Sequence, residues 1–194
     1  MKIGLMAGST RTGSYNRQVL ELAARDLAAR GHAVTQIDLA KLPLPIFAAD
    51  DEVAAFPDNA RTLKRLLQAQ DALLIAAPEY NGSLPPLLKN AIDWASRPTD
   101  GEAPMAWVAF RGKPVAILSA SPGTGGGMRM QQHLRQILSL LQAVVIPAQF
   151  ALPQAHLVLA DGTLADPLSK QILADTLDQL EWLGGLLAGA ATAS

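Results

Sequence analysis

Two segments of this chain are almost entirely apolar over the length of one strand, residues 71–77 (DALLIAA) and 114–120 (PVAILSA). A run of this kind is typical of a strand that is buried on both faces. Such strands occur in parallel sheets that helices cover on both sides, because a sheet with one wet face alternates apolar and polar residues instead. These two runs therefore predict an α/β fold with a parallel sheet at its centre.

The remaining segments alternate between strand-like and helix-like patterns. Further strands are predicted at 2–7, 32–39 and 143–146, and helices at 15–30, after Asp58, at 85–96, at 127–142 and at 167–187. Five strands that are each followed by a helix predict a doubly wound sheet in three layers. We expect one domain over 1–187 and a frayed tail over 188–194, which has no charge and no large side chain.

A polar loop with two glycines, residues 8–16 (GSTRTGSYN), joins the first predicted strand to the first predicted helix. An anion is easily held there, because a helix N-terminus presents unpaired N–H groups and the positive end of the helix dipole. Ser9 and Ser14 offer hydroxyl donors, Asn16 an amide, and Arg11 a guanidinium that matches a phosphate. We interpret the loop as a phosphate site. Helix capping alone would account for a serine or Asn16, but not for Arg11.

Two better-known phosphate loops do not match these residues. A P-loop would need a lysine and a hydroxyl residue where Ser14 and Tyr15 stand, and the dinucleotide fingerprint would need a glycine in place of Thr10. The loop therefore predicts a site for one terminal phosphate. A mononucleotide site after the first strand favours the flavodoxin-like strand order 2-1-3-4-5, which we predict.

Two more glycine-bearing loops follow the third and fourth predicted strands. Residues 78–86 (PEYNGSLPP) combine turn formers with Tyr80 and Glu79, and residues 119–127 (SASPGTGGG) hold four glycines in five positions. Glycines let the backbone approach a ligand closely. Ligands of doubly wound sheets bind beyond the carboxyl ends of the strands, so we expect the three loops to meet in one site. Turn chemistry alone would explain any one of them.

Composition and motif searches exclude several classes. A net charge of −1 without a basic cluster predicts no binding of nucleic acid, and the absence of cysteine excludes disulfides and thiolate chemistry. We expect no metal site and no catalytic side chain, because Gly-x-Ser-x-Gly does not occur and the three histidines lie far apart. No apolar run reaches the roughly 18 residues that span a bilayer. The chain enters a strand at residue 2 without an apolar signal segment, which predicts no membrane association and a cytoplasmic location.

Three ordered motifs resemble those of the NADPH-dependent FMN reductases, a group that includes bacterial quinone and chromate reductases and related azoreductases. Residues 8–16 resemble their G-S-x-R-x-x-S-x-N loop, and residues 78–83 with 89–94 (KNAIDW) look like P-E-Y-N-x-S followed by L-K-N-A-I-D-W. The glycine loop with Gln131, His133 and 134–135 is similar to G-G-x-R-x-Q-x-H-L-R. The resemblance covers residues 1 to about 147.

The resemblance implies an FMN site and assigns residues to it. The phosphate would be held by the first loop and the isoalloxazine ring would be lined by the other two, largely through their backbone. The implied cofactor-binding residues are Ser9, Arg11, Ser14, Tyr15, Asn16, Pro78, Glu79, Tyr80, Asn81, Gly82, Ser119, Ser121, Gly123 and Gly126. Glu79 is expected to position backbone and not to transfer protons.

The resemblance also implies an activity and an assembly. NADPH or NADH would pass a hydride to bound FMN, and a small oxidant such as a quinone, an azo compound, a chromate-type ion or free flavin would then be reduced in the same space. Family members form dimers or tetramers with the flavin near a subunit interface, so a homodimer or homotetramer is implied. No residue is assigned to the 2′-phosphate of NADPH.

Other interpretations remain at this stage. A flavodoxin-type electron carrier would use the same flavin site, although such carriers are typically strongly acidic. A phospho-receiver module would need acidic residues where Met6 and Ala7 stand. A domain for another phosphorylated small molecule is also open. The long segment 97–113, with Met105, Trp107 and Phe110, is either a lid beside the pocket, a partner surface or part of the core.

Overall fold

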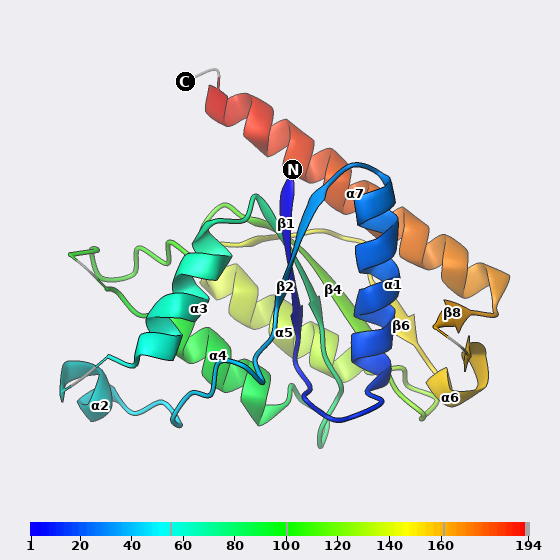
Figure 1. The fold of residues 1–194 in the computed structure, drawn as a ribbon, viewed down its shortest axis with the longest axis horizontal. Coiled ribbons are helices and arrows are strands. Elements are labelled where there is room, and N and C mark those ends of the chain that lie inside the picture. Colours follow the sequence, from blue (N-terminus) through cyan, green and yellow to red (C-terminus); the bar gives the residue numbers. More distant parts are fainter. Residues whose placement is uncertain (55, 100, 161, 193–194) are drawn as a thin grey trace.

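A parallel sheet lies at the centre of the computed structural model of this chain, which describes residues 1–54, 56–99, 101–160 and 162–192 (Figure 1). Its strands lie in the order β2-β1-β3-β4-β5, and every neighbouring pair is parallel. Their bounds are β1 Lys2–Ala7, β2 Ala33–Ile37, β3 Ala72–Ala76, β4 Pro114–Ala120 and β5 Val144–Val145. The predicted flavodoxin-like order is confirmed.

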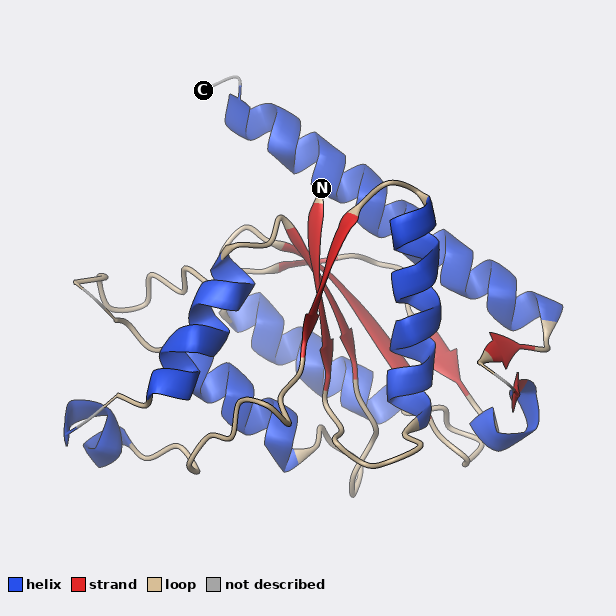
Figure 2. Ribbon diagram, in the orientation of Figure 1, coloured by secondary structure: helices blue, strands red, loops and turns tan. Residues whose placement is uncertain are grey.

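Helices cover both faces of this sheet, which confirms the three predicted layers (Figure 2). Two of them pack with one core cluster, α1 Tyr15–Ala29 and α7 Pro167–Thr192. Three pack with the other, α3 Asp58–Gln68, α4 Pro86–Ser96 and α5 Met128–Leu140. In β3, Leu74 belongs to the first cluster while Leu73 and Ile75 belong to the second. Successive side chains of a strand point to opposite faces, so a strand between two cores is apolar throughout.

The fifth strand differs from the prediction because it is interrupted. β5 pairs with Pro114 and Val115 at the start of β4, and a further strand, β6 Phe150–Leu152, pairs with the end of β4 at Leu118 to Ala120. Pro147 lies between the two pieces and has no backbone N–H to give to the ladder. The short run that we predicted at 143–146 is therefore the first half of a longer edge.

Other small elements were not predicted from the sequence. They are α2 Ala49–Ala54, α6 Ala155–Val158 and the hairpin of β7 Leu159–Ala160 with β8 Thr163–Leu164, each shorter than the windows in which a period can be recognised. The last helix, α7, continues to Thr192, so most of the predicted frayed tail is helical, while Ala193 and Ser194 lie outside the described residues. Within the described part of the chain, no helix is both long enough and apolar enough to cross a membrane.

The described residues of the segment 97–113, which are 97–99 and 101–113, lie at the amino ends of the strands, because they connect the end of α4 to the start of β4. Lys113 fastens it there by donating from Nζ to the carbonyls of Leu67 and Gln70, which precede β3. Phe110 is fully buried in the cluster of α3, α4 and α5. The core interpretation is confirmed for Phe110, and the interpretation as a lid beside this chain's own pocket is wrong.

Candidate functional site

The three loops predicted to converge do begin side by side at the carboxyl edge of the sheet. The N–H of Gly8 donates to the carbonyl of Ala76 at 2.8 Å, and the N–H of Ala77 donates to that of Leu118 at 3.1 Å. The loops after β1, β3 and β4 therefore leave the sheet from neighbouring strands, as the ribbon shows (Figure 2). A ligand at this edge can reach all three loops at once.

The first loop, residues 8–14, places two buried hydroxyl groups beside the start of α1. Ser9 and Ser14 are 6% and 4% exposed. Ser14 precedes the helix, and its side chain makes no capping hydrogen bond. The N–H of Gln18 donates to the carbonyl of Ser14, so the N–H groups of residues 15–17 have no acceptor in the helix. Unpaired donors and the positive end of a helix dipole are the features that favour an anion.

Arg11 adds a positive charge to the same loop. Its guanidinium donates to the carbonyls of Thr12 and Gly13, both at 3.1 Å, and lies 5.7 Å from the ring centre of Tyr15. Gly13 has a φ of +67°, the left-handed conformation that favours glycine. The guanidinium of Arg11 is thus bonded to two neutral carbonyl groups. A phosphate could take their place and would form stronger, charge-assisted hydrogen bonds.

Asn16 has a different place from the one we expected. Its amide donates to the carbonyl of Ala120 at 2.9 Å and its Oδ1 accepts from the N–H of Ala120, also at 2.9 Å. The residue is 3% exposed. The side chain therefore joins the first turn of α1 to the end of β4, and the backbone N–H of Asn16 lies among the unpaired donors of that turn.

The second loop forms a tight turn at the end of β3. Tyr80 and Ser83 exchange backbone hydrogen bonds of 2.9 and 3.0 Å, and the two residues between them have positive φ, +51° at Asn81 and +79° at Gly82. This is the conformation of a type I′ turn, for which Asn-Gly is the preferred pair. Tyr80 is 47% exposed beside the turn.

Glu79 connects this second loop to α5. Its carboxylate accepts from the backbone N–H of Arg129 at 3.1 Å and from Nε of the same residue at 2.6 Å. Hydrogen bonding to Arg129, opposed by burial, lowers the pKa of Glu79 below its ordinary value. Glu79 is thus an ionised group at the N-terminus of a helix, as we expect of a positioning residue.

The third loop is held by a buried serine at its base. Ser119 is fully buried, donates from Oγ to the carbonyl of Gly126 at 2.6 Å and accepts from Nε2 of Gln131 at 2.7 Å. A Cβ on Gly127 would lie 2.7 Å from the Cβ of Ser119, and φ is +90° there. The hydroxyl of Ser119 is therefore bonded within its own loop and to α5, where it supports the loop from its base.

The rest of this loop has a hydrogen bond between near neighbours in the sequence and exposed backbone groups. Ser121 accepts the N–H of Gly123 at 3.1 Å. At Gly126, a Cβ would come within 3.1 Å of the backbone of Pro153. Within the described residues, the N–H groups of Thr124 and Gly125 have no protein acceptor. Bare donors are therefore available at this edge for the polar rim of a flat ligand.

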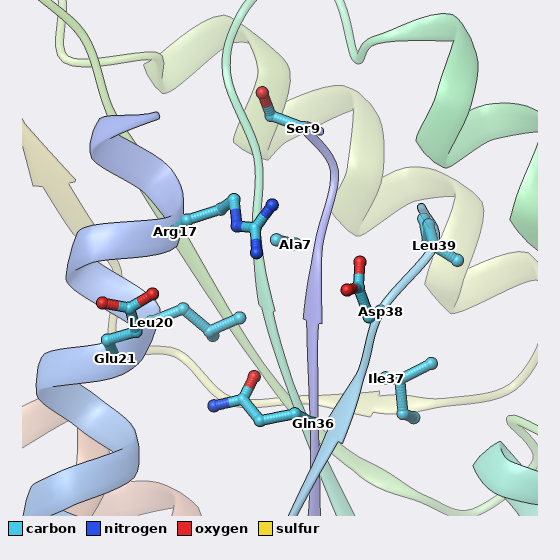
Figure 3. Close-up of a pocket in the computed structure, with 9 residues that line it drawn as sticks. All are labelled: Ala7, Ser9, Arg17, Leu20, Glu21, Gln36, Ile37, Asp38 and Leu39. Atoms are coloured by element: carbon cyan, nitrogen blue, oxygen red, sulfur yellow. The ribbon is translucent and has the colours of Figure 1, made fainter. Parts of the chain in front are cut away.

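A charged pocket that our sequence reasoning missed lies beside the first loop, between the ends of β1 and β2 and the first two turns of α1 (Figure 3). Its volume is about 290 Å³, and it is lined by Ala7, Ser9, Arg17, Leu20, Glu21, Gln36, Ile37, Asp38 and Leu39. The available signal was Asp38 near the end of the second predicted strand, with Arg17 at the start of the predicted helix 15–30.

Comparisons with known proteins agree with this geometry. The family model described as NADPH-dependent FMN reductase matches residues 1–157. The chain is 37% identical over 189 residues to an NAD(P)H-dependent FMN reductase of Pseudomonas aeruginosa, covering 93% of this chain and 94% of that protein. It is 37% identical over 188 residues to a quinone reductase of Escherichia coli K12, covering 90% and 93%.

A solved structure resembles the fold over nearly its whole length. It is that of FerB, a flavoenzyme NAD(P)H:(acceptor) oxidoreductase from Paracoccus denitrificans. The TM-score is 0.77 at 29% sequence identity, and the match covers 94% of this chain and 96% of that one.

Proposed function

This chain belongs to the NADPH-dependent FMN reductase family, and we propose that the three loops at the carboxyl edge of its sheet form a single FMN site. The protein is an FMN-dependent NAD(P)H oxidoreductase that acts on small-molecule substrates. When bound, FMN supplies the chemistry that takes a hydride from NAD(P)H and passes reducing equivalents to an oxidant. The residues of the chain supply the binding site, the orientation and the electrostatic field.

The phosphate end of FMN fits the first loop. Ser9 and Ser14 would donate their hydroxyls, the N–H groups of residues 15–17 would point at the phosphate oxygens, and Arg11 would turn from the carbonyls of its own loop to form a bidentate pair. The observation that carries the proposal is the start of α1, where buried hydroxyls, free amides and one guanidinium meet. Among the described residues, no carboxylate is hydrogen-bonded to Ser9, Arg11 or Ser14.

The ring end of FMN fits the second and third loops. Asn81, Gly82, Thr124 and Gly125 would offer backbone donors to the polar rim of the isoalloxazine, and Tyr80 would border it. Three of the side chains that the resemblance assigns to FMN would act on the loops and not directly on the flavin. Asn16, Glu79 and Ser119 hold the loops in register through the hydrogen bonds described above.

We propose quinones as the oxidant class, because relatives named as quinone reductases match 92% and 90% of the chain. No side chain needs to act as an acid or a base in taking up the hydride, which agrees with the backbone character of the ring loops. Nicotinamide and quinone would occupy the same space in turn. The cytoplasmic location predicted from the sequence stays a prediction.

The proposal is tested with the purified protein and its flavin. We expect a yellow protein that releases FMN on denaturation and that one equivalent of NADPH or NADH bleaches anaerobically, followed by reoxidation on addition of a quinone. A colourless protein that takes up no FMN would contradict the site. Accumulation of one-electron-reduced flavin without turnover of nucleotide would favour an electron carrier instead.

A further inference from the structure

The pocket between β1, β2 and α1 has a composition that the FMN site does not explain. It shares Ser9 with the phosphate loop but extends toward β2, away from the loops after β3 and β4 that would hold the ring. Its walls carry one guanidinium, from Arg17, and two carboxylates, from Glu21 and Asp38. These charged groups line a hollow of about 290 Å³ that is separate from the three loops assigned to FMN except at Ser9.

Arg17 is the least satisfied group of this pocket. Its guanidinium extends from α1 into the space between that helix and Asp38 (Figure 3), and within the described residues it makes no hydrogen bond or ion pair. By contrast, the guanidinium groups of Arg30, Arg97 and Arg129 are all paired with carboxylates. A partly buried, unpaired arginine in a cavity has its whole bidentate fork free for an anionic ligand.

Asp38 holds the opposite wall at the end of β2. Its Oδ1 accepts the N–H of Ala40 at 3.0 Å, which fixes the carboxylate where the chain leaves the sheet. In dinucleotide-binding folds, an acidic residue after the second strand accepts ribose hydroxyls, and a neighbouring arginine accommodates a 2′-phosphate. Here both kinds of residue face the same hollow (Figure 3).

We propose that this pocket binds the adenosine ribose of NAD(P)H, with Arg17 on the 2′-phosphate of NADPH and Asp38 on the ribose hydroxyl of NADH. This inference rests on the proposed function, because it names the second binding region of the same electron donor. Neighbouring strands lie about 4.8 Å apart, so the ends of β2 and of β3 or β4 are separated by roughly 10–15 Å. An extended dinucleotide covers that distance, which lets its nicotinamide reach the ring while its ribose stays in the pocket.

The two charges act in opposite directions on nucleotide choice. Arg17 attracts the 2′-phosphate, whereas the carboxylate of Asp38 repels it and accepts a hydrogen bond from a free 2′-hydroxyl. The pair therefore sets the preference between NADPH and NADH, and the wild-type protein is expected to use both.

The first test replaces Arg17. In Arg17→Ala we expect the KM for NADPH and the Kd for adenosine 2′,5′-bisphosphate to rise at least tenfold, while the KM for NADH changes less than threefold. Arg65→Ala is the matched control, because it removes the same charge from an exposed position on α3, on the other face of the sheet. Steady-state kinetics with a quinone and calorimetry with the bisphosphate give both readouts.

The second test replaces Asp38 and predicts the reverse. Asp38→Asn keeps an Oδ1 acceptor for the N–H of Ala40, so the local fold is retained. We expect tighter binding of adenosine 2′,5′-bisphosphate and a higher KM for NADH. Unchanged NADPH kinetics and unchanged bisphosphate affinity in Arg17→Ala would overturn the assignment of the pocket. The wild-type protein in that same experiment tests the proposed function separately. If it holds FMN and is reduced by the nucleotide, the reductase function stands. If it neither holds FMN nor is reduced, the reductase function is contradicted.

Discussion

Arg11 is the residue through which the phosphate site is most directly tested. Its guanidinium is exposed and bonded only to two carbonyls of its own loop, so its removal takes little from the fold. We expect Arg11→Ala to weaken FMN binding by about 1.5–3 kcal/mol, the contribution of a hydrogen bond to a charged group. Titration of the apoprotein with FMN, followed by flavin fluorescence, measures this loss.

A lysine at the same position serves as the control. Arg11→Lys keeps the charge but loses the planar fork, so it should recover part of the affinity and not all of it. Equal affinity in wild type and Arg11→Ala would show that the phosphate lies elsewhere.

Asn16, unlike Arg11, is expected to contribute mainly to the stability of the fold, because its side chain bonds to the backbone of Ala120. Asn16→Ala leaves the N–H and carbonyl of Ala120 without partners in a buried position. We expect the free energy of unfolding of the apoprotein to fall by about 1–3 kcal/mol, measured by urea denaturation. If the apoprotein is as stable as wild type and only FMN affinity drops, Asn16 is a phosphate ligand as its motif implies.

The ion pair of Glu79 with Arg129 predicts a dependence on pH. The pKa of Glu79 is lowered in the folded protein from an ordinary value of 4.5, so the ionised carboxylate contributes stability above that pH. This contribution is lost as the pH falls below 4.5 and through the lower pKa of the folded state.

The measurement for this pair is urea denaturation at several pH values. Glu79→Gln should be less stable than wild type at pH 7, and the difference should shrink in strongly acidic solution. The same difference at every pH would mean that shape and neutral hydrogen bonds, and not charge, hold α5 to the second loop.

At the scale of elements, the turn from β4 into α5 depends on the backbone at Gly127. A Cβ there would meet Ser119 at 2.7 Å, and a φ of +90° is strained for any other residue. We expect Gly127→Ala to lower the free energy of unfolding by roughly 1–3 kcal/mol and to loosen FMN binding, because Ser119 supports the third loop from below. Thermal unfolding and flavin titration follow both effects.

Gly125 provides a comparison within the same loop. A Cβ at this position would meet nothing within 4 Å, and its φ is not in the left-handed region. Gly125→Ala should therefore unfold at the temperature of wild type. If both alanine variants lose the same stability, the close approach of Gly127 to Ser119 is not what holds this turn.

At the scale of the whole molecule, the site lies at an edge with exposed large side chains. Tyr80, Met128 and Arg129 are 47%, 53% and, for its side chain, 77% exposed around the second and third loops. These features support the proposal that a second copy of the chain completes the walls of the flavin site. Light scattering should give two or four times the chain mass of 20.5 kDa. A fully active monomer would contradict this assembly.

Sequence reasoning succeeded where the deciding interactions are local. The continuous apolar runs predicted the doubly buried strands, and helical spacing placed the start of α1 where it is observed. The polar loop after the first strand led us to the observed strand order. Ser9, Arg11 and Ser14 lie in one short loop between β1 and α1, so their closeness in space follows from their closeness in the sequence. Sequence reasoning missed the strand at 150–152, because Pro147 interrupts the edge strand and the second piece is only three residues long.

The sequence by itself determined the layers of the fold and the family, and it singled out the first loop as the candidate phosphate site. Only the tertiary structure decided what Asn16, Ser119 and Arg17 do. Asn16 bonds to a residue 104 positions away, and Ser119 supports a glycine turn. Arg17 and Asp38 line one pocket only because β1 and β2 pair in parallel beside α1. Periodicity and turn chemistry are set by neighbours along the chain, whereas the partner of a polar side chain is chosen by packing between distant elements.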